Sequence, residues 1–260
     1  MLRSLKDLER YTVAATDGDV GAVVNFLIDD ERWAVRYLVA ETGSFFENRR
    51  VLISPISFRQ TDWATRTFHV QLTVDAVKSS PGTDTDRTVS RQHEVALAQH
   101  YRYPYYWESP GVWGIGAYPG ELANLGWSTP PLNGETPIVE SHLRSVNEMR
   151  DYHVEGSDGE IGHVKDFIVD DRTWEVRYLV VQTSAWWLGK RVLIAPRWAT
   201  SIVWSERKVH IRKNREEIRS SPDWDPHAAI NREYELRLYD YYGRPVYWSD
   251  DRPVEATVPR

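Results

Sequence analysis

The chain contains the same sequence twice at one constant spacing. Residues 2–107 correspond to residues 143–248 at an offset of 141, without insertion or deletion. Val-Arg-Tyr-Leu-Val at 35–39 returns at 176–180, and Tyr-Trp at 106–107 returns at 247–248. A unit of this length is domain-sized and far exceeds the roughly 20–50-residue period of solenoids. We therefore expect one fold in two copies, repeat 1 and repeat 2. Residues kept in both copies should serve the fold, and copy-specific residues a specialised task.

Composition and charge exclude several classes of protein. With 41% hydrophobic and 12% aromatic residues, each repeat can bury a core without disulfides or metal. The chain has no cysteine, which excludes disulfides, thiol nucleophiles and thiolate metal sites. It shows no apolar signal segment and no run of about 20 apolar residues. We therefore expect a cytoplasmic protein without membrane insertion. The net charge of −6 argues against a nucleic-acid partner.

Short strands separated by turns are predicted for the first part of each repeat. Asp-Gly at 17–18 and 158–159 predicts tight hairpins, followed by bulges near Gly21 and Gly162. Val35, Tyr37 and Val39 alternate with Arg36, as expected for a strand with two different faces. Five or six such strands predict a small antiparallel barrel. The expected fold class is mainly β with short helices: two tandem small barrels, each with a helical and aromatic C-terminal extension.

Helical periodicity follows the strands in each repeat. We expect helices over 90–101 and 231–242, with apolar stripes such as Tyr234, Leu238, Tyr241 and Tyr242, and a short helix capped by Asn214. An aromatic tail should then pack on the barrel as a lid. The expected organisation is repeat 1 over 1–108, a connector over 109–142, repeat 2 over 143–250 and a tail over 251–260. Because the connector is rich in apolar residues, we expect it to dock between the repeats.

These elements, in this order, resemble the PRC-barrel domain. The resemblance is carried by Asp-Gly-(Asp/Glu)-(Val/Ile)-Gly-x-Val, an Asp-rich turn, Val-Arg-Tyr-Leu-Val and Arg-Val-Leu-Ile-x-Pro, over 17–55 and 158–196. The family includes the cytoplasmic domain of the photosynthetic reaction-centre H subunit and the C-terminal domain of a ribosome-maturation factor. The resemblance implies a protein-docking module with no catalytic residues or cofactors of its own, linked by family to membrane energy-transducing complexes.

The residues themselves show no enzyme signature. Two pairs of adjacent carboxylates, Asp29-Asp30 and Asp170-Asp171, fit turn caps better than a metal or acid–base site, because neighbouring strand residues point to opposite faces. His69 and His210 have no second ligand at metal-binding spacing and fit cross-strand surface positions. A hydrolase or metal-binding protein is kept as the weakest alternative.

Copy-specific residues indicate where a partner would bind. Two aromatic pairs precede the fourth strand, and a basic cluster lies within 207–219 of repeat 2 only. The candidate partner-binding residues are Phe45, Phe46, Trp186, Trp187, Arg207, Lys208, Arg212, Lys213 and Arg215. Our main hypothesis is a non-catalytic scaffold or adaptor that binds another protein or itself. The alternative is an RNA- or ribosome-associated assembly factor that binds through the basic cluster.

Overall fold

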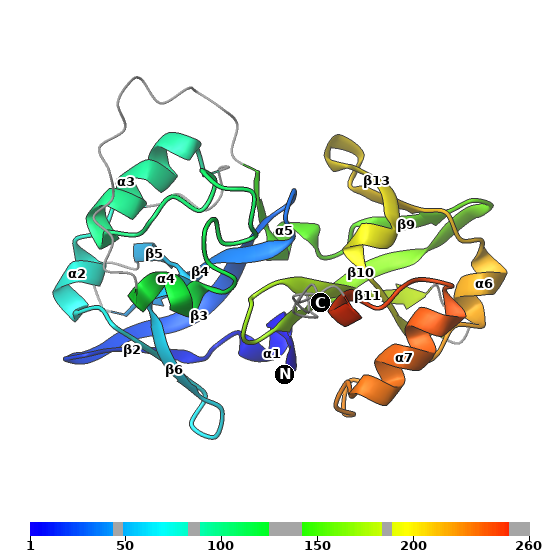
Figure 1. Cartoon of the computed structure of the whole chain (residues 1–260), viewed down its shortest axis with the longest axis horizontal. Helices are drawn as coiled ribbons and strands as arrows, with labels where there is room; N and C mark the ends of the chain where they lie inside the picture. Colours follow the sequence, from blue (N-terminus) through cyan, green and yellow to red (C-terminus); the bar gives the residue numbers. More distant parts are fainter. Residues whose placement is uncertain (44–48, 83–88, 125–141, 184–188, 250–260) are drawn as a thin grey trace, which may run out of the picture.

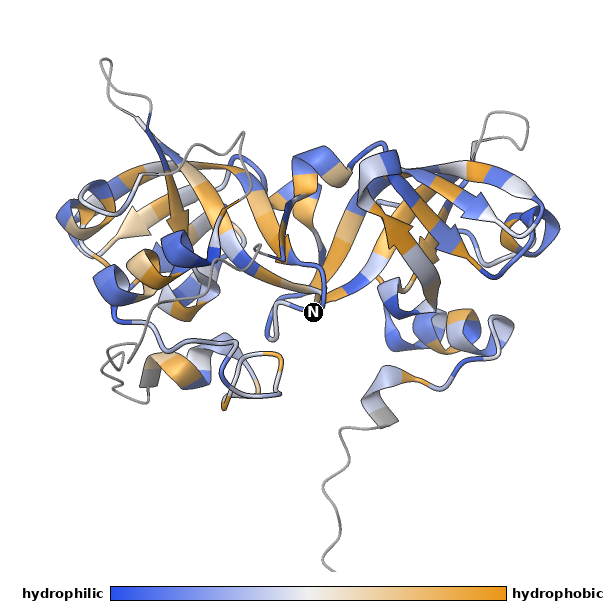
Figure 2. Ribbon diagram, turned by 90° about the horizontal axis from the view of Figure 1, so that it is seen from above, coloured by the Kyte–Doolittle hydropathy of each residue, from blue (hydrophilic) through white to orange (hydrophobic). Residues whose placement is uncertain are grey.

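A computed structural model describes residues 1–43, 49–82, 89–124, 142–183 and 189–249. The protein is mainly β, and the two repeats lie side by side along its long axis (Figure 1). Hydrophobic residues run along the strands of both sheets, while turns and helix surfaces are more polar (Figure 2). None of the helices in these residues combines the length and apolarity needed to cross a bilayer.

Repeat 1 forms a sheet in the order β5-β4-β3-β2-β7-β6. Its strands are β2 (Thr12–Ala15), β3 (Gly18–Asp29), β4 (Ala34–Thr42), β5 (Arg49–Ile53), β6 (Phe58–Asp62) and β7 (Thr67–Val70). The expected hairpin joins β2 to β3, but its two turn residues are Thr16 and Asp17, and Gly18 already pairs with Ala15 as part of β3. β2 and β7 pair in parallel, so the sheet is mixed and the expected purely antiparallel arrangement is wrong. The reason is the crossover from β5 through β6, which returns β7 beside β2 in the same direction. Among the described residues, no strand pair joins β5 to β6.

Repeat 2 forms the same sheet, in the order β12-β11-β10-β9-β14-β13. Its strands are β9 (His153–Gly156), β10 (Gly159–Asp170), β11 (Val176–Thr183), β12 (Arg191–Ile194), β13 (Ala199–Val203) and β14 (Lys208–Ile211). The glycines predicted to mark bulges lie at register shifts between the first two strands of each sheet. A Cβ atom on Gly21 or Gly162 would lie 2.0 Å from the carbonyl oxygen of Glu41 or Gln182. Only glycine permits this close approach of strands.

Each repeat donates its first residues to the other sheet. The arm of repeat 1, β1 (Leu2–Ser4) with α1 (Leu5–Leu8), pairs with β10 of repeat 2. The arm of repeat 2, β8 (Leu143–Ser145) with α5 (Val146–Met149), pairs with β3 of repeat 1 in the equivalent register. Both arms bury their apolar helix residues almost completely. The two repeats are therefore related like the subunits of a dimer with two-fold symmetry.

The turns before β4 and β11 meet at this two-fold centre. Val35 N donates to Trp174 O at 2.8 Å, and Val176 N donates to Trp33 O at 2.6 Å. Both tryptophans have left-handed backbones, with φ of 53° and 57°. Trp174 is buried against Phe26, Phe58 and Phe68 of repeat 1. Exchange of tryptophans thus accompanies the exchange of arms.

Short helices connect the strands of each repeat and cover part of each sheet. They are α2 (Val74–Lys78), α3 (Arg91–Tyr101) and η1 (Pro55–Ser57) in repeat 1, α4 (Pro119–Asn124) in the connector, and α6 (Arg215–Arg219), α7 (Arg232–Tyr241), η3 (Pro196–Trp198), η4 (Trp204–Glu206) and η5 (Tyr247–Ser249) in repeat 2. Asn214 forms the expected cap, as a capping box with Glu217. In Figure 1, α3 lies at the upper left and α7 at the lower right, consistent with the two-fold relation.

The expected helix stripe is only partly correct. Leu238 and Tyr242 are buried, but Tyr241 is 39% exposed, and the buried face instead includes Glu94 of α3 and Glu235 of α7. The face of β4 that carries Arg36 is also covered, because α3 and the aromatic tail pack over it and leave Arg36 with no exposed surface. Both faces of the central strands are therefore buried.

Candidate functional site

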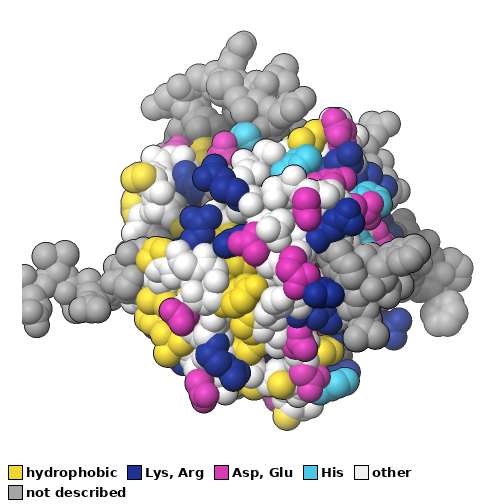
Figure 3. Space-filling model, turned by 90° about the vertical axis from the view of Figure 1, so that its right-hand side faces the viewer, with side chains coloured by type: hydrophobic (Ala, Val, Ile, Leu, Met, Phe, Trp, Pro, Cys, Tyr) yellow, Lys and Arg dark blue, Asp and Glu magenta, His cyan; other side chains and the backbone are white. Residues whose placement is uncertain are grey.

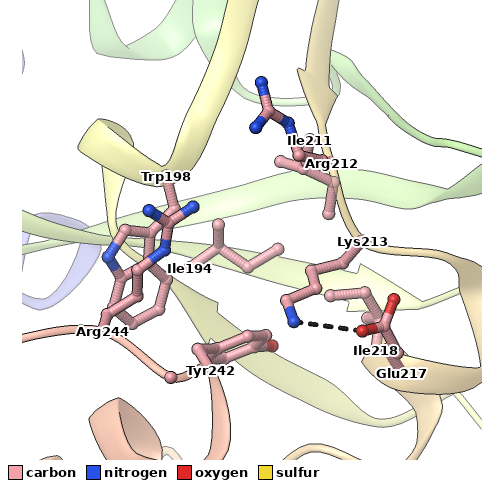
Figure 4. A pocket seen from close by; sticks show the side chains of 10 residues that line it. Ile194, Trp198, Ile211, Arg212, Lys213, Glu217, Ile218, Tyr242 and Arg244 are labelled. Atoms are coloured by element: carbon pink, nitrogen blue, oxygen red, sulfur yellow. Dashed lines mark hydrogen bonds and ion pairs between the residues drawn. The ribbon is translucent and has the colours of Figure 1, made fainter.

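A pocket of about 210 Å³ opens on repeat 2 at the end of β14; we call it the Lys213 pocket. Its floor is apolar and its rim is cationic (Figure 4). The lining residues are Ile194, Trp198, Ile211, Arg212, Lys213, Glu217, Ile218, Tyr242, Gly243 and Arg244. Such a combination of apolar floor and few polar groups is typical of ligand and peptide sites.

Five elements place these side chains. Ile194 ends β12 and Trp198 ends η3, while Ile211 ends β14. Trp198 and Tyr242 lie with ring centroids 4.8 Å apart and form one wall. Lys213 extends across the pocket, 6.0 Å from the centre of the Tyr242 ring. It is held by an ion pair of 3.0 Å with Glu217 of α6.

The equivalent place in repeat 1 is filled. Tyr103 N donates to Ala98 O, and Arg244 N donates to Tyr239 O, so the two backbones are equivalent. Tyr103 is 6% exposed; its ring stacks on Tyr101 with centroids 5.2 Å apart, and its hydroxyl bonds to Ser57. Arg244, in contrast, is exposed and leaves the apolar floor of repeat 2 accessible. Trp198 stands at the position of the smaller Ser57 and forms a wall of the pocket without filling it. The pocket is therefore specific to repeat 2.

Ion pairs neutralise most of the predicted basic cluster. These pairs join Lys208 to Glu155 and Glu206, Lys213 to Glu217, Arg215 to Asp158 and Arg219 to Glu216. Figure 3 shows acidic and basic side chains interspersed over this end of repeat 2, with hydrophobic side chains between them. Arg212 is exposed, and in Figure 4 it points away from Lys213. This surface is not a continuous positive field of the kind that follows a phosphate backbone.

The structure separates the predicted partner-binding residues into three groups. Arg212 and Lys213 line the pocket, and Trp198 joins them. Arg207 instead donates to Glu148 O, while Lys208 and Arg215 lie outside the pocket lining. The predicted aromatic residues Phe45, Phe46, Trp186 and Trp187 lie outside the described residues. Arg244 was not predicted from the sequence. The available signal was the alignment of the two aromatic tails at the offset of 141, which puts Arg244 at the position of Tyr103.

A buried polar network repeated in both copies was also missed. Tyr106 donates to Glu94 Oε2 at 2.7 Å, and Arg91 Nη1 lies 3.1 Å from Glu94 Oε1. The same contacts return in repeat 2, where Tyr247 donates to Glu235 at 3.0 Å and Arg232 pairs with Glu235 at 3.1 Å. The sequence signal for this network was the motif Arg-x-x-Glu, which occurs at 91–94 and again at 232–235. Because it recurs in both copies, we interpret this network as structural.

Burial changes the chemistry of Glu94. Loss of solvent raises the pKa of its carboxyl to about 7, although Arg91 and the Tyr106 hydroxyl oppose this shift. Burial also raises the pKa of Tyr37, with the charge of Glu94 adding to the effect. Desolvation disfavours the charged form of an acid in this way. The side chain of Glu94 has no exposed surface, which places this acid inside the fold.

The paired carboxylates cap turns and join the repeats. Asp29 Oδ1 accepts from the backbone of Glu31 and Arg32, and Asp29 Oδ2 pairs with buried Arg36 at 2.7 Å. Asp30 reaches across to the other repeat, where its carboxylate lies 2.7 Å from Arg144 Nε.

Repeat 2 uses its aspartates in the same way. Asp170 Oδ1 accepts from Arg172 N and Thr173 N, and Asp171 pairs with Arg3 at 3.1 Å. His69 and His210 lie on β7 and β14, opposite Gln60 and Ser201, as expected for cross-strand positions. In the part of the chain that the structure describes, no three acidic or histidine side chains converge as a metal site would require.

Comparison with known proteins adds no assignment. No protein-family model matches the chain, and no curated protein is similar to it in sequence.

Proposed function

We propose that this chain is a non-catalytic tandem PRC-barrel module that binds a protein partner through the Lys213 pocket. One observation carries the proposal: repeat 2 opens an apolar pocket with a cationic rim where repeat 1 fills the same place with Tyr103. A duplicated fold that keeps one site closed and the other accessible fits a scaffold with one specialised copy. The same strand order in both sheets supports one fold in two copies; its membership of the barrel family is part of the proposal.

The chemistry of the pocket defines the partner segment. A cavity of about 210 Å³ accommodates one large apolar side chain, for which Ile194, Ile218 and Tyr242 provide contacts. Lys213, Arg212 and Arg244 favour one or two carboxylates beside it. We therefore propose an acidic peptide segment with a central aromatic or aliphatic anchor. Ion pairs of Arg215 and Arg219 beside the pocket leave no continuous positive surface, which favours a short acidic segment over RNA.

Selection of displayed peptides on the intact chain tests the proposal. Enriched peptides should share an apolar anchor flanked by acidic residues. Their affinity should fall roughly tenfold or more in Lys213→Glu, because charge reversal on the rim opposes the carboxylates. Lys78→Glu makes the same charge change on an exposed residue of repeat 1 and should leave the affinity unchanged.

A second variant closes the pocket without changing the fold. Trp198→Ser with Arg244→Tyr reproduces the residues that fill the equivalent place in repeat 1, so it should remove binding while thermal unfolding stays cooperative. Selected peptides that bind this variant as tightly as the wild type would disprove the proposed site.

A further inference from the structure

The connector places a tryptophan on a buried arginine of repeat 1. Arg36 lies with its guanidinium carbon 3.8 Å from the centre of the Tyr106 ring and 4.8 Å from that of Trp113. Trp113 has no exposed surface, and its indole nitrogen donates to Thr173 O at 2.6 Å. Arginine against aromatic faces is a stabilising arrangement, and more so when it is removed from water.

Glycines shape the turn that presents Trp113. Gly114 N donates to Gly111 O at 3.0 Å, and Gly114 has a left-handed backbone with φ of 67°. A Cβ atom on Gly111 would lie 2.3 Å from Gly114 O. Arg32 Nη1 donates to the carbonyl oxygens of Gly111 and Tyr106 at 2.8 Å each. The glycine-rich segment is therefore a tight turn that inserts one indole between the repeats.

Among the described residues, repeat 2 contains the equivalent arginine site without a tryptophan that covers it. Arg177, the equivalent of Arg36, lies 4.1 Å from the centre of the Tyr247 ring, the equivalent of Tyr106. Beside it is a pocket of about 250 Å³, which we call the Arg177 pocket. It is lined by Glu31, Arg32, Trp33, Glu175, Val176, Arg177, Ala195, Pro196, Arg197, Tyr239 and Tyr247.

The Arg36 and Arg177 sites also correspond in the residues and helices that surround them. Arg32, which lines the Arg177 pocket, is the equivalent of Thr173, whose backbone oxygen accepts from Trp113. The helix η3 is the equivalent of η1, and α4 of the connector packs against η1. The side chain of Arg177 keeps 15% of its surface exposed, whereas that of Arg36 has none. Arg177 Nε is buried without a hydrogen-bond partner in the described residues. Residues 250–260, which follow repeat 2, contain no aromatic residue.

We propose that the Arg177 pocket binds a tryptophan that a partner protein presents on a tight, glycine-flanked turn, in the way that Trp113 lies on Arg36. The seated connector defines this occupant, because it shows which chemistry covers the same arginine and tyrosine in repeat 1. The ring packs between Arg177 and Pro196, and Arg197, which replaces Ile56, adds a cation that favours an acidic residue in the turn. This pocket shares no lining residue with the Lys213 pocket, so either proposal can fail alone.

A peptide with the sequence of residues 108–118, carrying a fluorescent label, is the direct probe. Fluorescence polarisation with the intact chain should show saturable binding, and the peptide with Trp113→Ala should bind roughly tenfold or more weakly, as for a buried aromatic anchor. Arg177→Leu in the chain should cause a similar loss. Arg59→Leu, on the exposed surface of β6 and outside both pockets, is the matched control and should cause none.

Photo-crosslinking keeps the test decisive if Arg177→Leu does not fold. A benzoylphenylalanine at the tryptophan position of the peptide should label the wild-type chain at Pro196 or Arg197. Absence of saturable binding, equal binding of the Trp113→Ala peptide, or labelling confined to the Lys213 pocket would each overturn the proposal. The last result would leave the Lys213 pocket as the peptide site and would count only against this inference.

Discussion

Trp174 of repeat 2 lies edge-on against Phe58 of repeat 1, with ring centroids 5.1 Å apart and planes at 75°. The backbone oxygen of Trp174 also accepts a hydrogen bond from Val35 N of repeat 1. Trp33 makes the equivalent backbone bond to Val176 of repeat 2, but its ring lines a surface pocket with Pro196, Ile202 and Trp204. The two repeats thus complete each other through reciprocal contacts, and neither sheet is independent of the other.

Replacement of Trp174 should destabilise the protein strongly. Trp174→Ala removes a side chain that is 3% exposed from an aromatic cluster, for which we expect a loss of about 3–5 kcal/mol in the free energy of unfolding. Trp33→Ala is the matched control, because it has the same left-handed backbone but is only partly buried, and should cost less. Chemical denaturation measures both losses. Equal losses would contradict the packing described for Trp174.

An isolated repeat 2 should form a symmetric dimer. Its arm carries Arg144 and Ser145, the equivalents of Arg3 and Ser4. Arg3 contacts Asp171 in the turn after β10, and Ser4 contacts Asp166 on β10. The arm of one copy can therefore dock on β10 of another and bury Val146 and Met149. Light scattering of residues 143–249 over a range of concentrations should show a folded dimer that unfolds as it dissociates. A folded monomer would contradict the reciprocal exchange.

Stability should depend on pH through Glu94. Its pKa is raised from 4.5 to about 7 in the folded protein, so its stabilising contribution is complete below pH 4.5 and is lost as the pH rises through about 7. Glu94→Gln stays neutral, and its free energy of unfolding relative to the wild type should increase over this window by on the order of 1–3 kcal/mol. Denaturation at several pH values measures this difference, with the exposed Glu233→Gln as control. A difference that does not vary with pH would show that Glu94 is charged in the fold.

Local patterns predicted the elements of each repeat well. The hairpins beside the Asp-Gly pairs, the bulges near Gly21 and Gly162 and the cap at Asn214 were all predicted, although the hairpin turns begin one residue earlier than expected. Each depends on a backbone preference or on a side chain that binds its own neighbours in the chain. The Asp-rich turns were also predicted, since Asp29 and Asp170 accept from residues two and three positions later.

Contacts between distant residues could not be read from one repeat alone. An arm could pair with the sheet of its own repeat or with that of the other repeat in the same strand register, because Leu2 and Leu143 belong to equivalent sequences. The sequence therefore does not distinguish exchanged arms from unexchanged ones. Burial of Arg36 and Glu94 depends on two elements, α3 and the aromatic tail, that meet only in the folded chain. The Lys213 pocket arises because Arg244 stands at the position of Tyr103, and its size depends on how Trp198 packs.

The central claim is that the binding function lies in repeat 2, where the pocket is open. Titration of the intact chain with indole-3-acetate, followed by two-dimensional amide NMR, tests it most directly, with tryptamine as the control of the same ring and opposite charge. We predict saturable shifts at Lys213, Ile218 and Gly243 with indole-3-acetate, smaller shifts with tryptamine, and none at the equivalent Leu72, Val77 and Arg102. Equal shifts in both repeats, or no shift at Lys213 up to the solubility of the probe, would contradict the account.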